Sequence, residues 1–166
     1  TYHGGVININ GATLRLDNQT GTYLFGAGES FNFGASGGGA LEIVAGHNHV
    51  WSGNNTVTTT GGAENTISGA DINSNSGGSA GTLTFNVADG DDASDLTMSC
   101  GLSNGGSVLK TGGGTLTLSG ANAYTGTTTV DDNGGTLQLG SGGTAGSLST
   151  SSAISIGSGA TFAVNQ

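Results

Sequence analysis

Apolar and polar residues alternate with a period of two in short runs that recur along the whole chain. In residues 115–119, Leu116 and Leu118 alternate with Thr and Ser, a pattern typical of a strand with one buried face. No segment of ten or more residues has the apolar spacing of a helix. A pattern of glycine, small residue and apolar–polar–apolar triplet occurs in residues 11–16, 39–43, 81–85, 114–118, 135–139 and 159–164, with a weaker copy at 65–68.

The spacing of these runs predicts a repeat architecture. The positions that we take as equivalent are Leu14, Leu41, Ile67, Leu83, Leu116, Leu137 and Phe162, which give a mean step of about 25 residues. Pairs such as Gly-Gly and Asn-Gly lie between the runs, where corners need positive φ angles. A sandwich or barrel would need hairpins and strands about 8–12 residues apart. Similar motifs at similar phase instead favour a solenoid, which stacks Leu on Leu and Thr on Thr. We therefore predict an all-β fold, a parallel β-solenoid of about seven coils, and treat residues 1–166 as a single domain.

The two ends of the chain are similar to each other. Residues 6–18 loosely match residues 153–166, so the chain ends in the phase in which it begins. That is expected of a section from a long array, or of subunits that stack end to end. Neither terminus resembles a polar cap, and exposed strand edges invite strand addition from another chain. We therefore expect copies of the chain to associate head to tail.

Composition and charge exclude several partners. The chain has 35 Gly, no Pro and 8% charged residues, and its solubility rests on Thr, Ser and Asn. Arg15 and Lys110 are the two basic residues against 11 acidic ones, for a net charge of −9. Nucleic acid and anionic lipid are poor partners for such a surface, because phosphate binding needs clustered Lys and Arg. The sequence contains no run of about 18 apolar residues, so we expect no transmembrane helix. The single cysteine, Cys100, excludes an intramolecular disulfide.

Residues 108–139 carry a more specific set of motifs. They contain Lys110, then Gly-Thr-Leu-Thr-Leu-Ser-Gly ending at Gly120, Asn-Ala-Tyr-Thr-Gly ending at Gly126, and Gly-Thr-Leu-Gln-Leu ending at Leu139. This segment resembles the passenger-associated transport repeat, also called the autotransporter-associated β-strand repeat, of bacterial surface proteins. Residues 1–16 resemble the second half of another copy. The resemblance implies a right-handed parallel β-helix that is exported and exposed on a bacterial surface.

An acidic loop is the sharpest local feature outside the repeat. Asp89, Asp91, Asp92 and Asp95 lie in one short segment with Gly90. Oxygen-rich loops with glycine can hold Ca²⁺, which takes six to eight oxygen ligands. The spacing and distal Glu of an EF-hand are missing, and a solvated turn between strands is the alternative interpretation. Calcium is the one cofactor that we consider for this chain.

Aromatic and imidazole side chains suggest two further sites. His47 and His49 would share one face of a strand, with His3 elsewhere, yet no third metal ligand is identifiable from spacing. Exposed Trp51 and Tyr124 could stack on sugar rings, which makes surface glycans a candidate partner. The five Phe residues alternate as core residues would: Phe25, Phe31, Phe33, Phe85 and Phe162.

Catalytic chemistry is not indicated. Glu29, Glu42 and Glu64 are scattered among different coils, and nothing marks a pair of the kind that glycoside hydrolysis requires. No Gly-x-Ser-x-Gly motif supports a Ser–His–Asp triad. We expect Cys100 to be a small buried hydrophobe and Lys110 to have an ordinary surface or turn role.

These observations favour a structural or adhesive module of an extracellular or cell-surface bacterial protein, which assembles end to end into a fibre and is not an enzyme. The alternatives are a carbohydrate-binding adhesin and a polysaccharide-acting β-helix enzyme. Individual sites, more than the fold, would separate the three.

Overall fold

The computed structural model describes residues 5–17, 22–34, 38–45, 48–76 and 79–166. These residues form strands and turns, and no helix. A helix of the length and apolar character needed to cross a membrane is therefore not found in this part of the chain.

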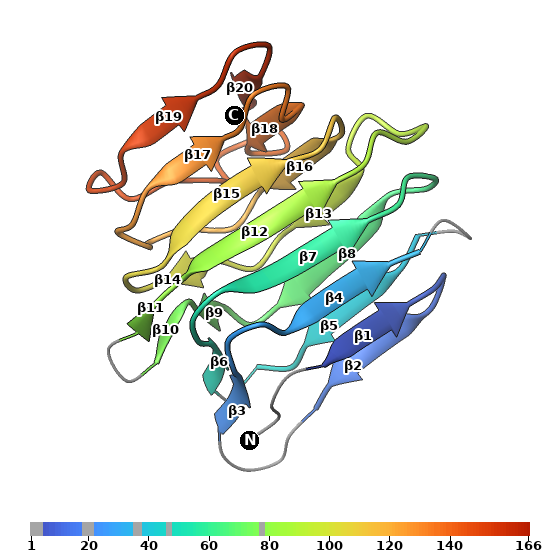
Figure 1. The fold of residues 1–166 in the computed structure, drawn as a ribbon, viewed down its shortest axis with the longest axis vertical. Helices are drawn as coiled ribbons and strands as arrows, with labels where there is room; N and C mark the ends of the chain where they lie inside the picture. Colours follow the sequence, from blue (N-terminus) through green and yellow to red (C-terminus); the bar gives the residue numbers. More distant parts are fainter. Residues whose placement is uncertain (1–4, 18–21, 35–37, 46–47, 77–78) are drawn as a thin grey trace.

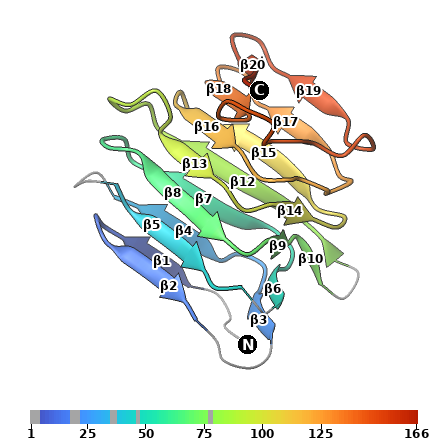
Figure 2. The ribbon, with the colours of Figure 1, turned by 180° about the vertical axis from the view of Figure 1, so that it is seen from behind.

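Two seven-stranded parallel sheets form the main walls of the molecule. The first sheet, which faces the viewer in Figure 1, contains β1 (Val6–Ile9), β4 (Ser30–Phe33), β7 (Asn55–Thr59), β12 (Thr82–Val87), β15 (Ser107–Thr111), β17 (Thr128–Val130) and β19 (Ile154–Ile156). The second sheet, seen in Figure 2, contains β2 (Thr13–Leu16), β5 (Ala40–Ile43), β8 (Asn65–Gly69), β13 (Leu96–Met98), β16 (Thr115–Leu118), β18 (Thr136–Leu139) and β20 (Thr161–Val164).

A third, shorter sheet closes the coil on one side. It contains β3 (Thr22–Phe25), β6 (Asn48–Trp51), β9 (Ile72–Asn73) and β14 (Leu102–Ser103), all parallel. Beyond β14, a bridge between Ala121 and Ser147 continues this side. A small antiparallel pair, β10 (Asn75–Ser76) and β11 (Ser79–Ala80), is inserted before β12.

The strands form a right-handed parallel β-helix. Each strand of the first sheet is followed by one of the second sheet, and the same sheet is re-entered one coil later. First-sheet strands run to the upper right in Figure 1, and second-sheet strands run to the lower right when seen from behind in Figure 2, while the chain climbs from bottom to top. The chain makes about six turns of about 26 residues each, which confirms the predicted solenoid. The first sheet has seven strands, one from each successive pass of the chain, and we number the coils one to seven by these strands.

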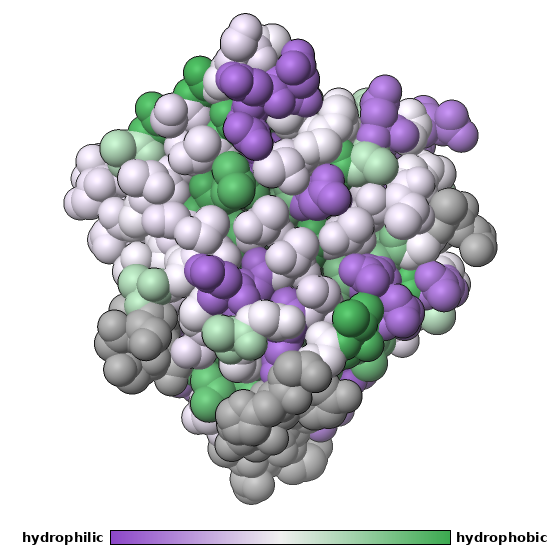
Figure 3. Space-filling view, viewed as in Figure 1, coloured by the Kyte–Doolittle hydropathy of each residue, from purple (hydrophilic) through white to green (hydrophobic). Residues whose placement is uncertain are grey.

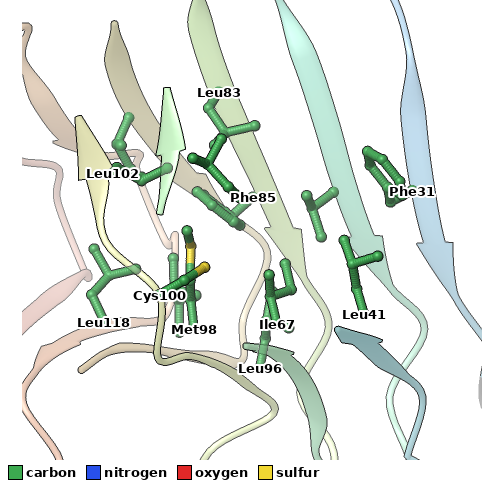
Figure 4. Packing of buried hydrophobic residues seen from close by; sticks show 14 of the residues in the cluster. Phe31, Leu41, Ile67, Leu83, Phe85, Leu96, Met98, Cys100, Leu102 and Leu118 are labelled. Carbon is green, nitrogen blue, oxygen red and sulfur yellow. The ribbon is translucent and has the colours of Figure 1, made fainter. Parts of the chain in front are cut away.

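The core lies between the sheets, because alternate residues of each strand point inward. Leu116 and Leu118 are buried as their alternation predicts, and the inward side chains stack in columns from coil to coil. Figure 4 shows this packing, with Met98 and Cys100 side by side. Each fully buried aliphatic or aromatic side chain of this kind contributes about 2 kcal/mol to stability.

The seven predicted equivalences are correct only in part: Leu14, Leu41 and Ile67 share one inward column, whereas Leu116, Leu137 and Phe162 share the neighbouring column of the same sheet, two residues away in register. Leu83 lies on β12 in the first sheet and pairs with Asn55 and Val108, whereas the other six positions lie in the second sheet. The second-sheet strand of that coil is β13, where Met98 pairs with Ile67. The motif at 81–85 therefore has the same local sequence pattern as its second-sheet relatives but forms a different wall of the coil.

Candidate functional site

The corner between the first and second sheets in the fifth coil holds a buried lysine. Lys110 lies on β15 and is 0% exposed. Its side chain points inward, in the column that contains Phe85 one coil below and Val130 one coil above. The expectation that Lys110 lies at the surface is therefore wrong, whereas the alternative expectation of a role in a turn agrees with its contacts.

Three backbone carbonyls surround the ammonium group. Lys110 Nζ donates to the oxygens of Thr111 at 2.9 Å, Gly112 at 2.8 Å and Gly134 at 2.7 Å. Gly134 belongs to the next coil, so the side chain joins two coils. Gly112 has a φ of 77°, and a Cβ there would lie 2.4 Å from the carbonyl oxygen of Val87, so this turn requires glycine. We call Lys110 and its three carbonyl partners the Lys110 corner.

A buried aspartate lies one coil below. Asp95 is 2% exposed and accepts hydrogen bonds from the backbone N–H groups of Gly90 and Thr115, both at 2.7 Å. Burial lowers the pKa of Lys110 to about 8, and the Asp95 carboxylate opposes this shift. The Lys110 ammonium and the Asp95 carboxylate thus each form hydrogen bonds mainly with backbone groups. These hydrogen bonds hold the turns of successive coils together.

Asn122 and Tyr124 make similar links on the opposite side of the coil. Asn122 is buried; its Oδ1 accepts from Leu102 N at 3.1 Å, and its Nδ2 donates to Gly120 O at 2.9 Å. Its backbone N–H donates to Ser147 O at 3.0 Å in the coil above. The Tyr124 hydroxyl shares a hydrogen bond of 2.6 Å with Thr128 Oγ1. Burial raises the pKa of Tyr124, and its hydrogen-bond partners oppose the shift.

The burial of Tyr124 and Trp51 corrects their expected role as exposed sugar-stacking residues. Trp51 is buried, with its ring stacked on Phe31 at a centroid distance of 4.8 Å. Tyr124 is buried as described above. Aromatic side chains bury a large area, and here both rings fill the interior of the solenoid. Neither ring is presented to a ligand at the surface.

The acidic loop is only partly exposed. Asp89, Asp91 and Asp92 are exposed, and Asp92 Oδ2 accepts from Glu64 N at 2.7 Å. Asp95 turns inward to its two backbone partners. In the described ranges, no group of three or more His, Cys, Asp or Glu side chains comes together as a metal site would require. Calcium binding by these four aspartates stays a prediction.

The remaining candidate side chains are dispersed. His3 and His47 lie outside the described residues, and His49 is buried with its Nε2 3.3 Å from Val44 O. Glu42 pairs with Arg15 at 3.2 Å on the surface, and Glu64 accepts from Thr97 Oγ1. A catalytic pair formed by these residues is not evident from their contacts.

The expectation for Cys100 is confirmed, since the thiol is buried in the core. Burial raises the pKa of Cys100 to about 12, and the Asp71 charge adds to the shift.

The sequence also contained a signal for the buried position of Lys110. Lys110 lies two residues after Val108 on an alternating strand, so both side chains point to the same, inward face. At this position the alternation of the strand predicts burial correctly, although the side chain is charged.

The C-terminal edge of the solenoid exposes core positions. Ile154, Ile156 and Val164 are 46%, 40% and 61% exposed. Their partners one coil below are the buried residues Thr128, Val130 and Leu139. Hydrophobic side chains are visible over β19 at the upper left of Figure 3. These side chains point inward but have no coil above them in the described residues.

The fold and its buried corners place the chain in the class of right-handed parallel β-helix proteins. Residues 108–139 match the family model of the passenger-associated-transport-repeat, which is the segment that contains Lys110, Asn122 and Tyr124. Residues 108–139 thus carry an autotransporter passenger repeat, which together with the β-solenoid fold supports a structural module of the passenger type. The family implies a secreted or surface-exposed protein. No curated protein and no solved structure matches the chain.

Proposed function

We propose that this chain is a non-catalytic building block of a bacterial surface fibre, in which the C-terminal edge of one copy stacks on the N-terminal edge of another. The observation that carries the proposal is the exposure of Ile154, Ile156 and Val164, whose partners in the coil directly below are buried. Exposed apolar side chains next to an unpaired strand edge favour association.

The columns of inward side chains support this mode of stacking. Ile156 lies in the column that begins with Ile7. Val164 lies in the column that begins with Leu14. A second copy placed above the first would therefore continue both columns in register, with aliphatic side chains on both sides of the junction.

The test compares two charged substitutions on β19. Ile156→Lys places a charge in the exposed core column, whereas Ser155→Lys places the same charge on the outward face of the same strand. Sedimentation equilibrium should show concentration-dependent association of the original chain. We expect Ile156→Lys to weaken association at least tenfold and Ser155→Lys to leave it nearly unchanged. Electron microscopy should show filaments with the original chain and short rods with Ile156→Lys.

Two results would contradict the proposal. One is a chain that stays monomeric at high concentration. The other is an equal loss of association with both variants, since that would point to contact through the outward face of the sheet. Circular dichroism of each variant checks that the solenoid itself remains folded.

A further inference from the structure

Glu29 is buried without a hydrogen-bond partner. It directly precedes β4, shares the inward parity of Phe31 and Phe33, and is 2% exposed. Within the described part of the chain, neither carboxylate oxygen accepts a hydrogen bond. Isolated carboxylates are very costly to bury, and buried charges in proteins are normally paired or bound to metal.

Other acidic residues of the chain show what a satisfied carboxylate looks like here. Asp95 accepts from two backbone N–H groups, and Asp71 accepts from Gly101 N at 2.7 Å. The two basic side chains are engaged elsewhere: Arg15 with Asp17 and Glu42, and Lys110 with three carbonyls. Glu29 therefore stands apart from these residues in being both buried and unpaired.

Two more unpaired polar atoms lie at the same corner, where the chain passes from the third sheet to the first. Thr56 N donates to Glu29 O at 3.0 Å, which places Asn55 beside Glu29 on the neighbouring coil. Asn55 Nδ2 donates to Ser52 O at 3.2 Å, and its buried Oδ1 has no partner among the described residues. Trp51 Nε1 is also buried and unpaired there. Its ring stacks on Phe31, two residues after Glu29 on the same face.

We infer that Glu29 and Asn55 bind a small hard cation inside the solenoid. The two carboxylate oxygens and the amide oxygen are ligands that such cations prefer, and backbone carbonyls or water would complete the shell. A cation would neutralise the buried charge. Ca²⁺ and Na⁺ are two common ions of this chemistry, and both are tested below. This site is separate from the acidic loop, where Asp95 and Asp92 already accept backbone hydrogen bonds.

Terbium luminescence tests the site directly, because Tb³⁺ replaces Ca²⁺ at oxygen sites and is sensitised by a nearby indole. Trp51 is the single tryptophan of the chain, so excitation of tryptophan reports on ions near this corner. We expect sensitised luminescence from the original chain that Ca²⁺ displaces. Glu29→Gln should reduce the signal at least tenfold. The control, Asp91→Asn combined with Asp92→Asn, removes two exposed charges of the acidic loop and should retain the signal.

Thermal unfolding gives a second readout that identifies the ion. In choline buffer with chelator, Glu29→Gln should raise the melting temperature above that of the original chain, because it removes an uncompensated buried charge. Added Ca²⁺ or Na⁺ at about ten times its Kd should raise the melting temperature of the original chain by about 4 °C and leave Glu29→Gln unchanged. The ion that raises the melting temperature of the original chain when it is added without the other is the ion that the site binds.

The inference is overturned by any of three results. Luminescence could persist in Glu29→Gln, it could disappear only in the acidic-loop control, or neither ion could change the melting temperature of the original chain relative to Glu29→Gln. The last result would show that the protein buries Glu29 without a cation. None of these outcomes depends on end-to-end association, so this test and the test of assembly can fail separately.

Discussion

Lys110 Nζ donates a hydrogen bond of 2.7 Å to the carbonyl oxygen of Gly134 in the next coil. The two residues are 24 positions apart, about one turn of the solenoid. A charged side chain therefore holds together two coils that strand pairing alone would join only along their sheets. The same donor also binds the carbonyls of Thr111 and Gly112, which fixes the turn that follows its own strand.

Lys110→Met should destabilise the chain substantially. The substitution keeps a long side chain in the column but removes the donor from one buried and two partly buried carbonyls, which costs about 3 kcal/mol in total. Urea denaturation followed by circular dichroism measures the change in the free energy of unfolding. Leu109→Thr, on the outward side of the same strand, is the control and should change this free energy by less than about 0.5 kcal/mol. Equal effects of the two substitutions would contradict the role of the Lys110 corner.

The difference in the free energy of unfolding between the original chain and Lys110→Met should depend on pH, and the direction of this dependence can be worked out. Lys110 has a pKa of about 8 in the folded chain, against 10.5 as its ordinary value. Between these two pH values the unfolded chain binds more protons, so this group makes stability rise with pH. The free energy of unfolding of the original chain should therefore rise relative to that of Lys110→Met from pH 8 to pH 10.5. Shifts of Cys100 and Tyr124 act on both proteins and cancel in the comparison; a flat or falling difference would contradict the shift.

Tyr124→Phe tests the hydroxyl link on the other side of the coil. Removing the hydroxyl leaves Thr128 Oγ1 with its second partner, Ser152, at 2.9 Å, so the loss should be modest, about 1 kcal/mol. Tyr124→Ala should cost about 4 kcal/mol, because it also leaves a cavity in the core. Denaturant unfolding of both variants measures these costs. A cost of Tyr124→Ala no larger than that of Tyr124→Phe would show that the ring is not packed in the core.

Cys100 should be unreactive in the folded chain. Its thiol is buried, with a pKa of about 12 against the ordinary 9.0, and the thiolate is the reactive form. Ellman's reagent at pH 8 should release colour from unfolded chain in urea and almost none from folded chain. Rapid labelling of the folded chain would mean that the coil around β13 opens readily.

The solenoid fold could be predicted from the sequence, whereas the buried side chains at its corners were predicted less well. Strand alternation around Leu116 and Leu118 identified the inward face correctly, because a period of two depends on local sequence alone. Leu83 was misplaced because the same local pattern occurs in both sheets, and only pairing with distant coils distinguishes them. Trp51 and Lys110 were expected to interact with solvent because of their chemistry. The parity of Lys110 with Val108 did indicate an inward position, but the backbone partner a coil away that its ammonium group binds is not indicated by a single sequence.

Asp95→Ala distinguishes a structural role of the acidic loop from a surface one. Asp95 accepts backbone hydrogen bonds from Gly90, on its own loop, and from Thr115, at the start of β16 in the coil above. Alanine would leave both partly buried N–H groups without this acceptor, which should lower the free energy of unfolding by about 3 kcal/mol. Asp91→Ala, four residues earlier in the same loop and exposed, is the matched control and should have almost no effect. Urea denaturation in chelator makes the comparison independent of calcium. If the two substitutions were equally mild, Asp95 would not be the residue that fastens this loop to the next coil.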